Sequence, residues 1–292
     1  MDRHERRERR RARRVVRQMD RAARRSRRRP GRTLGALVLL AAVVAVTALV
    51  LPEGWEPADI LRPRAYVEID GAAVAVPRPD PSSGRVLPPV PVTTAGSHAF
   101  LHTDEAGAPV GYDPCRPVRY AMRPDGAPQG GDQLVTDAIA IVSAASGLAF
   151  IDVGPTDEPP ALGRALIQPD RYGAAWAPVL VAWSDETSVP ELAGQVAGVG
   201  GSAAVPGASG QGTWLAAGRL VLDTPDLTAI LGRSDGYAQA RAIVVHELAH
   251  VLGLDHVDDA TELMHPMTST RTDLGPGDLQ GLALVGQVAC EE

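Results

Sequence analysis

The chain has 292 residues, enough for one substantial domain with appendages or for two small domains. All 29 basic residues are arginine, and 16 of them fall in residues 1–32 beside four acidic residues, so this arm carries 16 − 4 = +12 and the remainder −6 − 12 = −18. Such a division excludes a uniformly basic nucleic-acid-binding body, and we interpret the arm as topology-setting or lipid-facing rather than as a nucleic-acid-binding segment.

An apolar run without any charge follows the arm at residues 33–51. Nineteen helical residues span about 28 Å, close to the roughly 30 Å hydrocarbon core of a bilayer. The run therefore predicts one transmembrane helix, with the basic arm in the cytoplasm and everything after residue 51 outside the cell. A cleaved secretory signal is the alternative, because Val46-Thr47-Ala48 resembles a small-residue cleavage site; the length of the run favours the anchor. The body is exported in either case.

Residues 52–96 are rich in proline and predict a semi-rigid spacer, with a brief strand at residues 66–70. The globular domain is expected at residues 97–292. Alternating apolar residues predict a strand at 117–122, and further strands are expected at 150–153, 179–183 and 219–222. Asp132 is a candidate cap for a helix that ends at Gly147.

The stretch 194–212 is rich in glycine but lacks the order of a phosphate-binding loop, so we expect a flexible loop beside an edge strand. Ser234 or Asp235 is expected to cap the next helix. Strands and helices in this mixed order favour an α+β layer structure.

That helix carries His246-Glu247-Leu248-Ala249-His250, followed by Gly253 and His256. Two histidines four residues apart lie about 40° from each other on one helix face, so both can reach one metal ion. Glu247 is placed to hydrogen-bond a water molecule on that metal, as a general base would be. Gly253 allows a sharp turn that returns His256 as a third ligand. Three ligands leave the fourth position open, as in catalytic zinc sites.

The stretch HELAHVLGLDH resembles the long zinc signature of the metzincin peptidases, and Glu262-Leu263-Met264-His265-Pro266 resembles their Met-turn, with Met264 beneath the metal. Residues 274–282 are similar to the start of the C-terminal helix of the matrixin-like branch. The resemblance covers residues 97–292 and does not extend to the arm or the spacer.

The resemblance implies a metzincin-like catalytic domain: a twisted mixed β-sheet, an active-site helix, a Met-turn and a C-terminal helix. His246, His250 and His256 would bind one catalytic Zn²⁺, and Glu247 would activate water and pass its proton to the leaving amine. A protein or peptide substrate would lie along an edge strand near the glycine-rich stretch, in the manner of β-strand addition. The structural zinc and calcium sites of animal matrixins have no clear counterpart in this sequence. Nothing in the sequence indicates an oligomeric state.

The two cysteines, Cys115 and Cys290, are expected to form a disulfide in an exported domain, in preference to free thiols or to Cys115 as a zinc latch. Animal matrixins keep a latch cysteine in a propeptide, and here no cysteine precedes Cys115. His98 and His102 have helical metal-binding spacing but no partner cluster, so we interpret them as ordinary histidines.

Three alternatives to the zinc peptidase follow from the same residues. The histidines could be hydrogen-bonded in a helix without metal, although this leaves the register of Gly253, His256 and Met264 unexplained. The domain could be an inactive zinc-binding, membrane-tethered interaction module, against which the retention of Glu247 argues. A site that uses Glu262 in place of His256 would need a second helix to supply that acid.

Overall fold

The structure is a computed structural model that describes residues 55–61, 63–69, 71–267 and 271–292. The chain divides into two compact units, Met1–Pro52 and Glu53–Glu292, and all described residues belong to the second. Within the described ranges, no helix is long and apolar enough to cross a membrane. The transmembrane helix predicted at residues 33–51 lies outside them.

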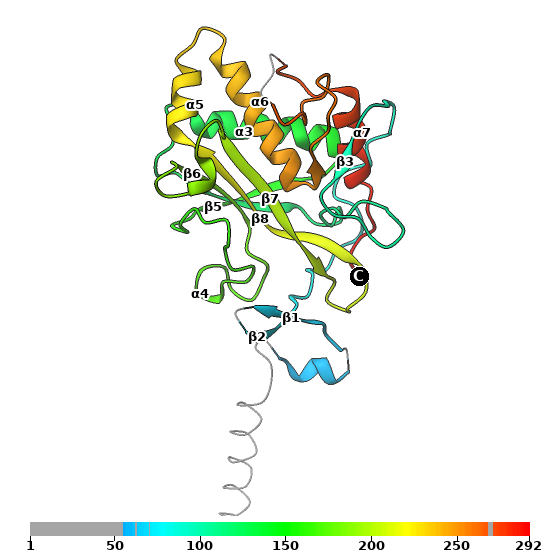
Figure 1. Cartoon of the computed structure of the whole chain (residues 1–292). Helices are drawn as coiled ribbons and strands as arrows, with labels where there is room; N and C mark the ends of the chain where they lie inside the picture. The colour runs from blue at the N-terminus through cyan, green and yellow to red at the C-terminus, as the bar shows by residue number, and fades with distance from the viewer. Residues whose placement is uncertain (1–54, 62, 70, 268–270) are drawn as a thin grey trace, which may run out of the picture. The chain divides into compact units, whose positions relative to one another are not determined.

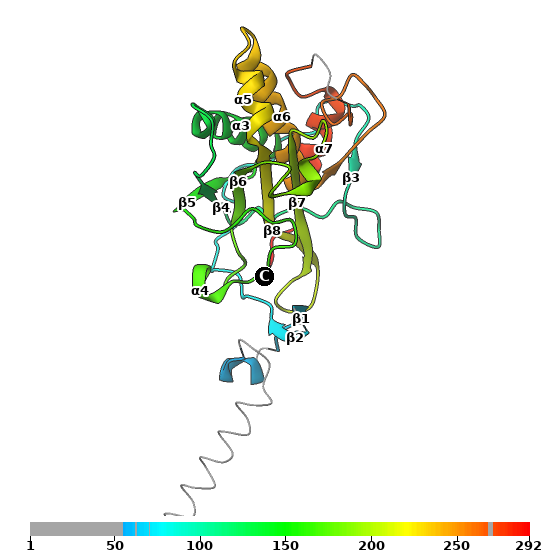
Figure 2. The same cartoon turned by 60° about the vertical axis from the view of Figure 1, so that its left-hand side comes forward.

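A five-stranded mixed sheet forms the centre of the domain, in the order β5-β4-β6-β8-β7. Strands β4 (Val118–Arg123), β5 (Phe150–Pro155), β6 (Val179–Ser184) and β8 (Thr213–Asp223) run parallel, and β7 (Gly198–Pro206) pairs antiparallel with β8 at one edge. Figure 1 and Figure 2 show α3 (Gly131–Ser146) and α6 (Gly236–Val251) against one face of this sheet. The mixed sheet with packed helices confirms the predicted α+β class.

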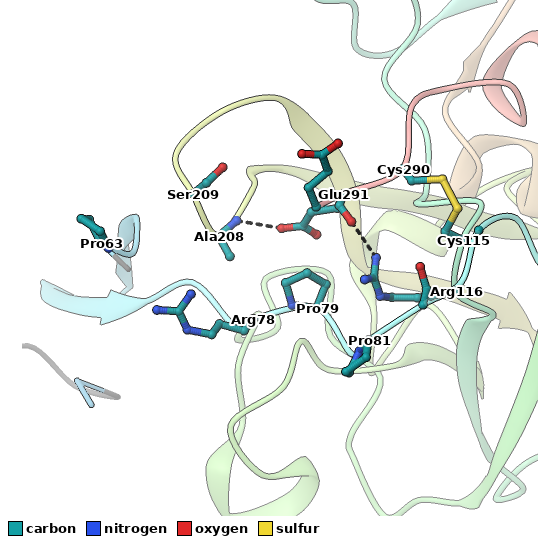
Figure 3. A pocket seen from close by; sticks show the side chains of 13 residues that line it. Pro63, Arg78, Pro79, Pro81, Cys115, Arg116, Ala208, Ser209, Cys290 and Glu291 are labelled. Carbon is teal, nitrogen blue, oxygen red and sulfur yellow. Dashed lines mark hydrogen bonds between the residues drawn. A yellow bond between two sulfur atoms is a disulfide. The ribbon is translucent and has the colours of Figure 1, made fainter. Parts of the chain in front are cut away.

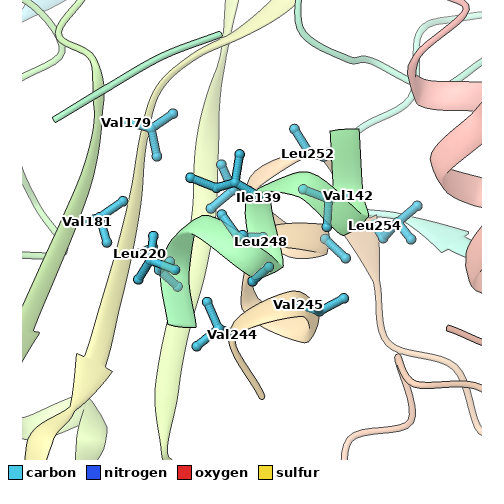
Figure 4. Close-up of a cluster of buried hydrophobic side chains, with 14 of the residues drawn as sticks. Ile139, Val142, Val179, Val181, Leu220, Val244, Val245, Leu248, Leu252 and Leu254 are labelled. Atoms are coloured by element: carbon cyan, nitrogen blue, oxygen red, sulfur yellow. The ribbon is translucent and has the colours of Figure 1, made fainter. Parts of the chain in front are cut away.

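The main core lies between the sheet and these two helices. Alternate residues of β6 and β8 face the helices, because successive side chains of a strand point to opposite faces. Figure 4 shows Val179, Val181 and Leu220 of these strands packed against the two helices. The helix residues in contact are Ile139 and Val142 of α3 and Val244, Val245 and Leu248 of α6. All of these side chains are buried, so α6 is held rigidly over the sheet at the level of its histidines.

Loops cover the opposite face of the sheet. Val221 packs there with Val189, which precedes the short helix η2 (Pro190–Leu192), and with Leu192, which ends it. A buried ion pair fixes the loop between β5 and β6: the guanidinium of Arg164 contacts the carboxylate of Glu158 at 2.6 Å and donates to the carbonyl of Gly218 at 2.7 Å. Helix α4 (Pro169–Tyr172) belongs to the same loop.

The predicted strands and helices are present in the domain, with three differences in detail. Asp235 precedes α6 at the expected position, but its side chain makes no cap hydrogen bond. Helix α3 ends at Gly147 in the left-handed conformation as expected, but Gly130 precedes it and Asp132 makes no cap hydrogen bond. The glycine-rich stretch forms the edge strand β7 itself instead of a flexible loop beside one, because β8 supplies a backbone partner for residues that carry little strand propensity of their own. Helix α5 (Thr224–Leu231) connects β8 to α6.

The proline-rich segment contains short ordered elements and contacts the rest of the domain. It holds η1 (Pro57–Ile60) and the hairpin β1 (Tyr66–Ile69) with β2 (Ala72–Ala75), which includes the strand predicted at residues 66–70. Buried Asp59 pairs with Arg64 at 3.2 Å and with Arg78 at 2.6 Å. Further along, Arg85 donates to the carbonyl of Gly286 at 2.7 Å. This segment therefore packs as part of the unit that begins at Glu53.

Cys115 and Cys290 form a disulfide in the structure, with Cα atoms 5.5 Å apart. A pocket of about 720 Å³ lies beside this disulfide, lined by Arg78, Arg116 and Glu291 among others. Figure 3 shows a hydrogen bond between two of these residues: Arg116 donates to the carbonyl of Glu291 at 3.0 Å. The disulfide thus joins the start of the sheet to the end of the chain.

Candidate metal centre

Helix α6 presents His246 and His250 on the side that faces away from the main core, and the chain turns sharply after it. The helix ends at Val251, and Gly253 adopts a positive φ of 108°, which a side chain would strain. Its N–H donates to the carbonyl of His250 at 3.0 Å. The turn leads into β9 (Leu254–Asp255), which pairs with β3 (Ala99–Phe100) and delivers His256.

The three predicted histidines converge at their Nε2 atoms. Those of His246 and His256 lie 3.1 Å apart, those of His250 and His256 3.1 Å, and those of His246 and His250 3.2 Å. Four tetrahedral ligands placed 2.0–2.1 Å from zinc would be about 3.3 Å from one another. The spacing of the three nitrogens therefore suits one zinc ion at their centre.

The hydrogen bonds of the other ring nitrogens support this interpretation. Nδ1 of His246 donates to the carbonyl of Leu263 at 2.7 Å, and Nδ1 of His250 donates to that of Leu254 at 2.8 Å. In a neutral imidazole whose Nδ1 carries the proton, Nε2 offers only a lone pair. Two such lone pairs facing each other have no proton to share, so a cation between them is the arrangement that satisfies both.

The surroundings of these imidazoles favour the neutral form, which is the form that binds metal. Burial lowers the pKa of His246 to about 3, with a further lowering from His250, although the bond to Leu263 opposes the shift. The pKa values of His250 and His256 are also lowered, chiefly by burial. Ligands that stay uncharged at neutral pH do not have to release a proton before a metal ion binds.

Glu247 follows His246 directly in α6, and its side chain is buried. Burial raises the pKa of its carboxyl to about 7, while a hydrogen bond from the backbone of Gly200 on β7 acts in the opposite direction. Among the described residues, the groups with metal-ligand spacing are His246, His250 and His256, and a second set whose cysteines are already joined in the disulfide. Glu247 is thus a neighbour of the triad and lies outside the ligand set.

The Met-turn lies directly beneath these rings and is held by the last helix, α7 (Pro276–Val285). Met264 is buried, and its carbonyl accepts from the N–H of Val257, one residue after the third histidine. The carboxylate of Asp278 accepts from the N–H of Leu263 at 2.5 Å and of Met264 at 3.2 Å. The backbone of Leu263 is therefore held at its N–H by Asp278 and at its carbonyl by His246.

The other candidate metal ligands lie outside the cluster of three histidines. Glu262 is buried and accepts from the N–H groups of Gly277 at 2.9 Å and Asp278 at 3.1 Å, so it serves the start of α7 and is not placed as a metal ligand. His98 stacks edge-on against Phe100 with ring centroids 5.5 Å apart. Neither His98 nor His102 is in a described metal-binding group.

Sequence reasoning missed Asp278, which holds the backbone of Leu263 next to His246. Asp278 falls inside the segment that resembles a matrixin C-terminal helix, which was the available signal for it.

One comparison with known proteins supports the site. The family model described as Matrixin matches residues 190–284, which include β7, β8, α6, the Met-turn and most of α7, and so supports a matrixin-like peptidase domain here. No curated protein sequence matches this chain. Among solved structures, the GM1-bound form of the ECX AB5 holotoxin is similar over 60% of this chain and 82% of its own, at 12% identity and a TM-score of 0.34. A likeness that weak carries no argument.

Proposed function

We propose that this chain is a zinc-dependent endopeptidase whose centre is formed by His246, His250, His256 and Glu247. The observation that carries the proposal is the convergence of three Nε2 atoms within 3.1–3.2 Å beside a buried carboxylate. The Matrixin match over residues 190–284 supports the same class independently of the geometry.

Each residue has a separate role in the proposed reaction. The three imidazoles would hold the zinc ion. When bound, zinc would supply an acidified water and polarise the scissile carbonyl. Glu247 would accept a proton from the attacking water and later donate it to the leaving amine nitrogen. Because burial raises the pKa of this carboxyl to about 7, it can both take and release a proton near neutral pH. The substrate would extend the sheet along β7.

The test uses the full chain, purified in detergent, with and without Glu247→Gln. We expect about one zinc per chain in both proteins, and chelator-sensitive release of peptides from casein by the wild type alone. Glu247→Gln keeps the size of the side chain, so loss of turnover with retained zinc isolates the proton-transfer role. Zinc binding without cleavage of casein or of a broad peptide library would favour the inactive interaction module. Normal activity of Glu247→Gln would refute the mechanism.

We also propose that residues 33–51 anchor the enzyme in a membrane with residues 53–292 outside the cell. The uncharged run and the arginines before it support this, and the disulfide suits an oxidising compartment. Extraction of membranes with alkaline carbonate, combined with the intact mass of the cellular protein, provides the test. An anchored chain stays with the membrane and keeps its arm, whereas a cleaved signal gives a shorter, soluble product.

A further inference from the structure

Edge strand β7 lies directly against α6 at the residue proposed as the general base. A β-carbon added to Gly198 would stand 2.8 Å from Cγ of Glu247 and 3.4 Å from its Cδ. One added to Gly200 would collide with the carbonyl oxygen of Glu247 and stand 3.1 Å from its Cα. The 2.8 Å distance at Gly198 and the collision at Gly200 are shorter than real β-carbon contacts, so a larger residue at either place would displace Glu247 or the strand.

The two glycines share one face of β7, since they are two positions apart. Val199, between them, packs instead with the cluster of Val189, Leu192 and Val221 on the other face of the sheet. Neither Gly198 nor Gly200 has a positive φ, so backbone conformation does not demand glycine at either place. Proximity to Glu247 is therefore the main physical reason for these two residues, and at Gly198 the Cδ2 of Leu222, 3.2 Å from an added β-carbon, limits the space further.

The backbone of Gly200 also acts on the functional end of the Glu247 side chain, since it opposes the rise in the pKa of the carboxyl that burial causes. The edge strand thus meets Glu247 in two places: at the backbone through Gly200 and at the side-chain carbons through Gly198. Together these contacts restrict where the carboxylate can lie.

We propose that Gly198 and Gly200 are positioning residues, which let β7 hold the Glu247 carboxylate toward the centre of the three histidines. This rests on the proposed function and adds a coupling to it: the strand along which the substrate would lie is also the strand that orients the base. Correct pairing of a substrate with β7 would therefore favour the productive placement of Glu247.

The main test is Gly198→Ala in the full chain. The added methyl group faces α6, away from the proposed substrate edge, so we expect unchanged zinc content and a KM within about twofold of wild type. We expect kcat to fall about 10- to 100-fold, because a displacement near 1 Å at a reacting group has an effect of that order. Gly163→Ala is the matched control, since a β-carbon at that exposed position meets nothing within 4 Å.

A second measurement reports on the contact without any activity. The thermal midpoint is compared for Gly198→Ala and Gly200→Ala, each with Glu247 intact and in a Glu247→Ala background. The Gly198→Ala loss should shrink in that background, because the clashing Cγ and Cδ atoms are gone. The Gly200→Ala loss should persist, since its clash is with the backbone of residue 247.

The outcomes separate this inference from the proposed function. If Gly198→Ala keeps the wild-type kcat, or if its thermal loss is the same in both backgrounds, the positioning role is wrong although the enzyme remains a peptidase. If the wild type cleaves nothing while the thermal cycle behaves as expected, the peptidase proposal fails and the contact stands.

Discussion

Asp278 on α7 offers a sharp test of how the metal centre is supported, through replacement by alanine. Its buried carboxylate accepts from the N–H groups of Leu263 at 2.5 Å, Met264 at 3.2 Å and Gly275 at 2.7 Å. Asp278→Ala leaves three buried donors without this acceptor, each costing about 1–3 kcal/mol. Removal of a carboxylate whose pKa burial already raises offsets part of that loss. We therefore expect a net destabilisation of about 3 kcal/mol, equivalent to a fall of about 6–12 °C in the thermal midpoint.

The second expected effect is on zinc affinity. The carbonyl of Leu263 accepts from Nδ1 of His246 at 2.7 Å, so a displaced Leu263 peptide no longer fixes that ring. Loss of such an outer partner lowers metal affinity about 10- to 100-fold. Competition with a zinc indicator measures this below the unfolding temperature, and Asp170→Ala, at an exposed position, is the control. Unchanged zinc affinity in a folded but less stable Asp278→Ala protein would refute the proposed relay from Asp278 through Leu263 to His246.

Three further predictions concern other parts of the domain. Burial acts to raise the pKa of Glu158, but hydrogen bonds from Arg164 and other side chains outweigh it and lower this pKa. The Glu158–Arg164 pair therefore stabilises the fold above the unfolded pKa of about 4.5, and this stabilisation is lost as pH falls through the lower folded pKa. Glu158→Gln should cost about 3 kcal/mol at pH 7, by urea unfolding, and the gap to wild type should close in acid. Cys115→Ser with Cys290→Ser should cost up to about 5 kcal/mol on the chain-entropy model, and an unchanged urea midpoint would contradict it. Chelation should lower the thermal midpoint, and zinc at about 100 times its Kd should restore about 2.7 kcal/mol, an effect that His256→Ala should abolish at the same zinc concentration.

The sequence predicted the elements whose residues carry a local signal. Helix α3 ends at Gly147, where the chain takes a left-handed turn that favours glycine, and the strand of alternating residues at 118–123 lies in the sheet. The histidine motif was predictable for the same reason: the helical repeat and one glycine turn determine where three rings meet. These features depend on neighbours within about ten residues.

What the sequence could not predict depends on contacts between distant backbones. The proline-rich segment has no repeating apolar face, and it is attached through carbonyl groups, as where Gln287 donates to Val90 at 2.8 Å. Any residue type supplies a carbonyl, so such contacts leave no sequence signal. Strand β7 is similar, since glycines at 198 and 200 favour a loop by local propensity but are required by the closeness of α6. In both cases tertiary packing overrides the local signal.

The disulfide has a consequence for the fate of the chain once it is cut. Cys115 and Cys290 are 175 positions apart and enclose the sheet, α6 and the whole Met-turn in one covalent ring. A single break in any exposed loop inside this ring, made by any peptidase, opens the ring but releases no fragment. The nicked molecule keeps its mass apart from one added water, and its two pieces separate only after reduction. The arrangement would suit the proposed peptidase, because its own exposed loops would then meet its own activity.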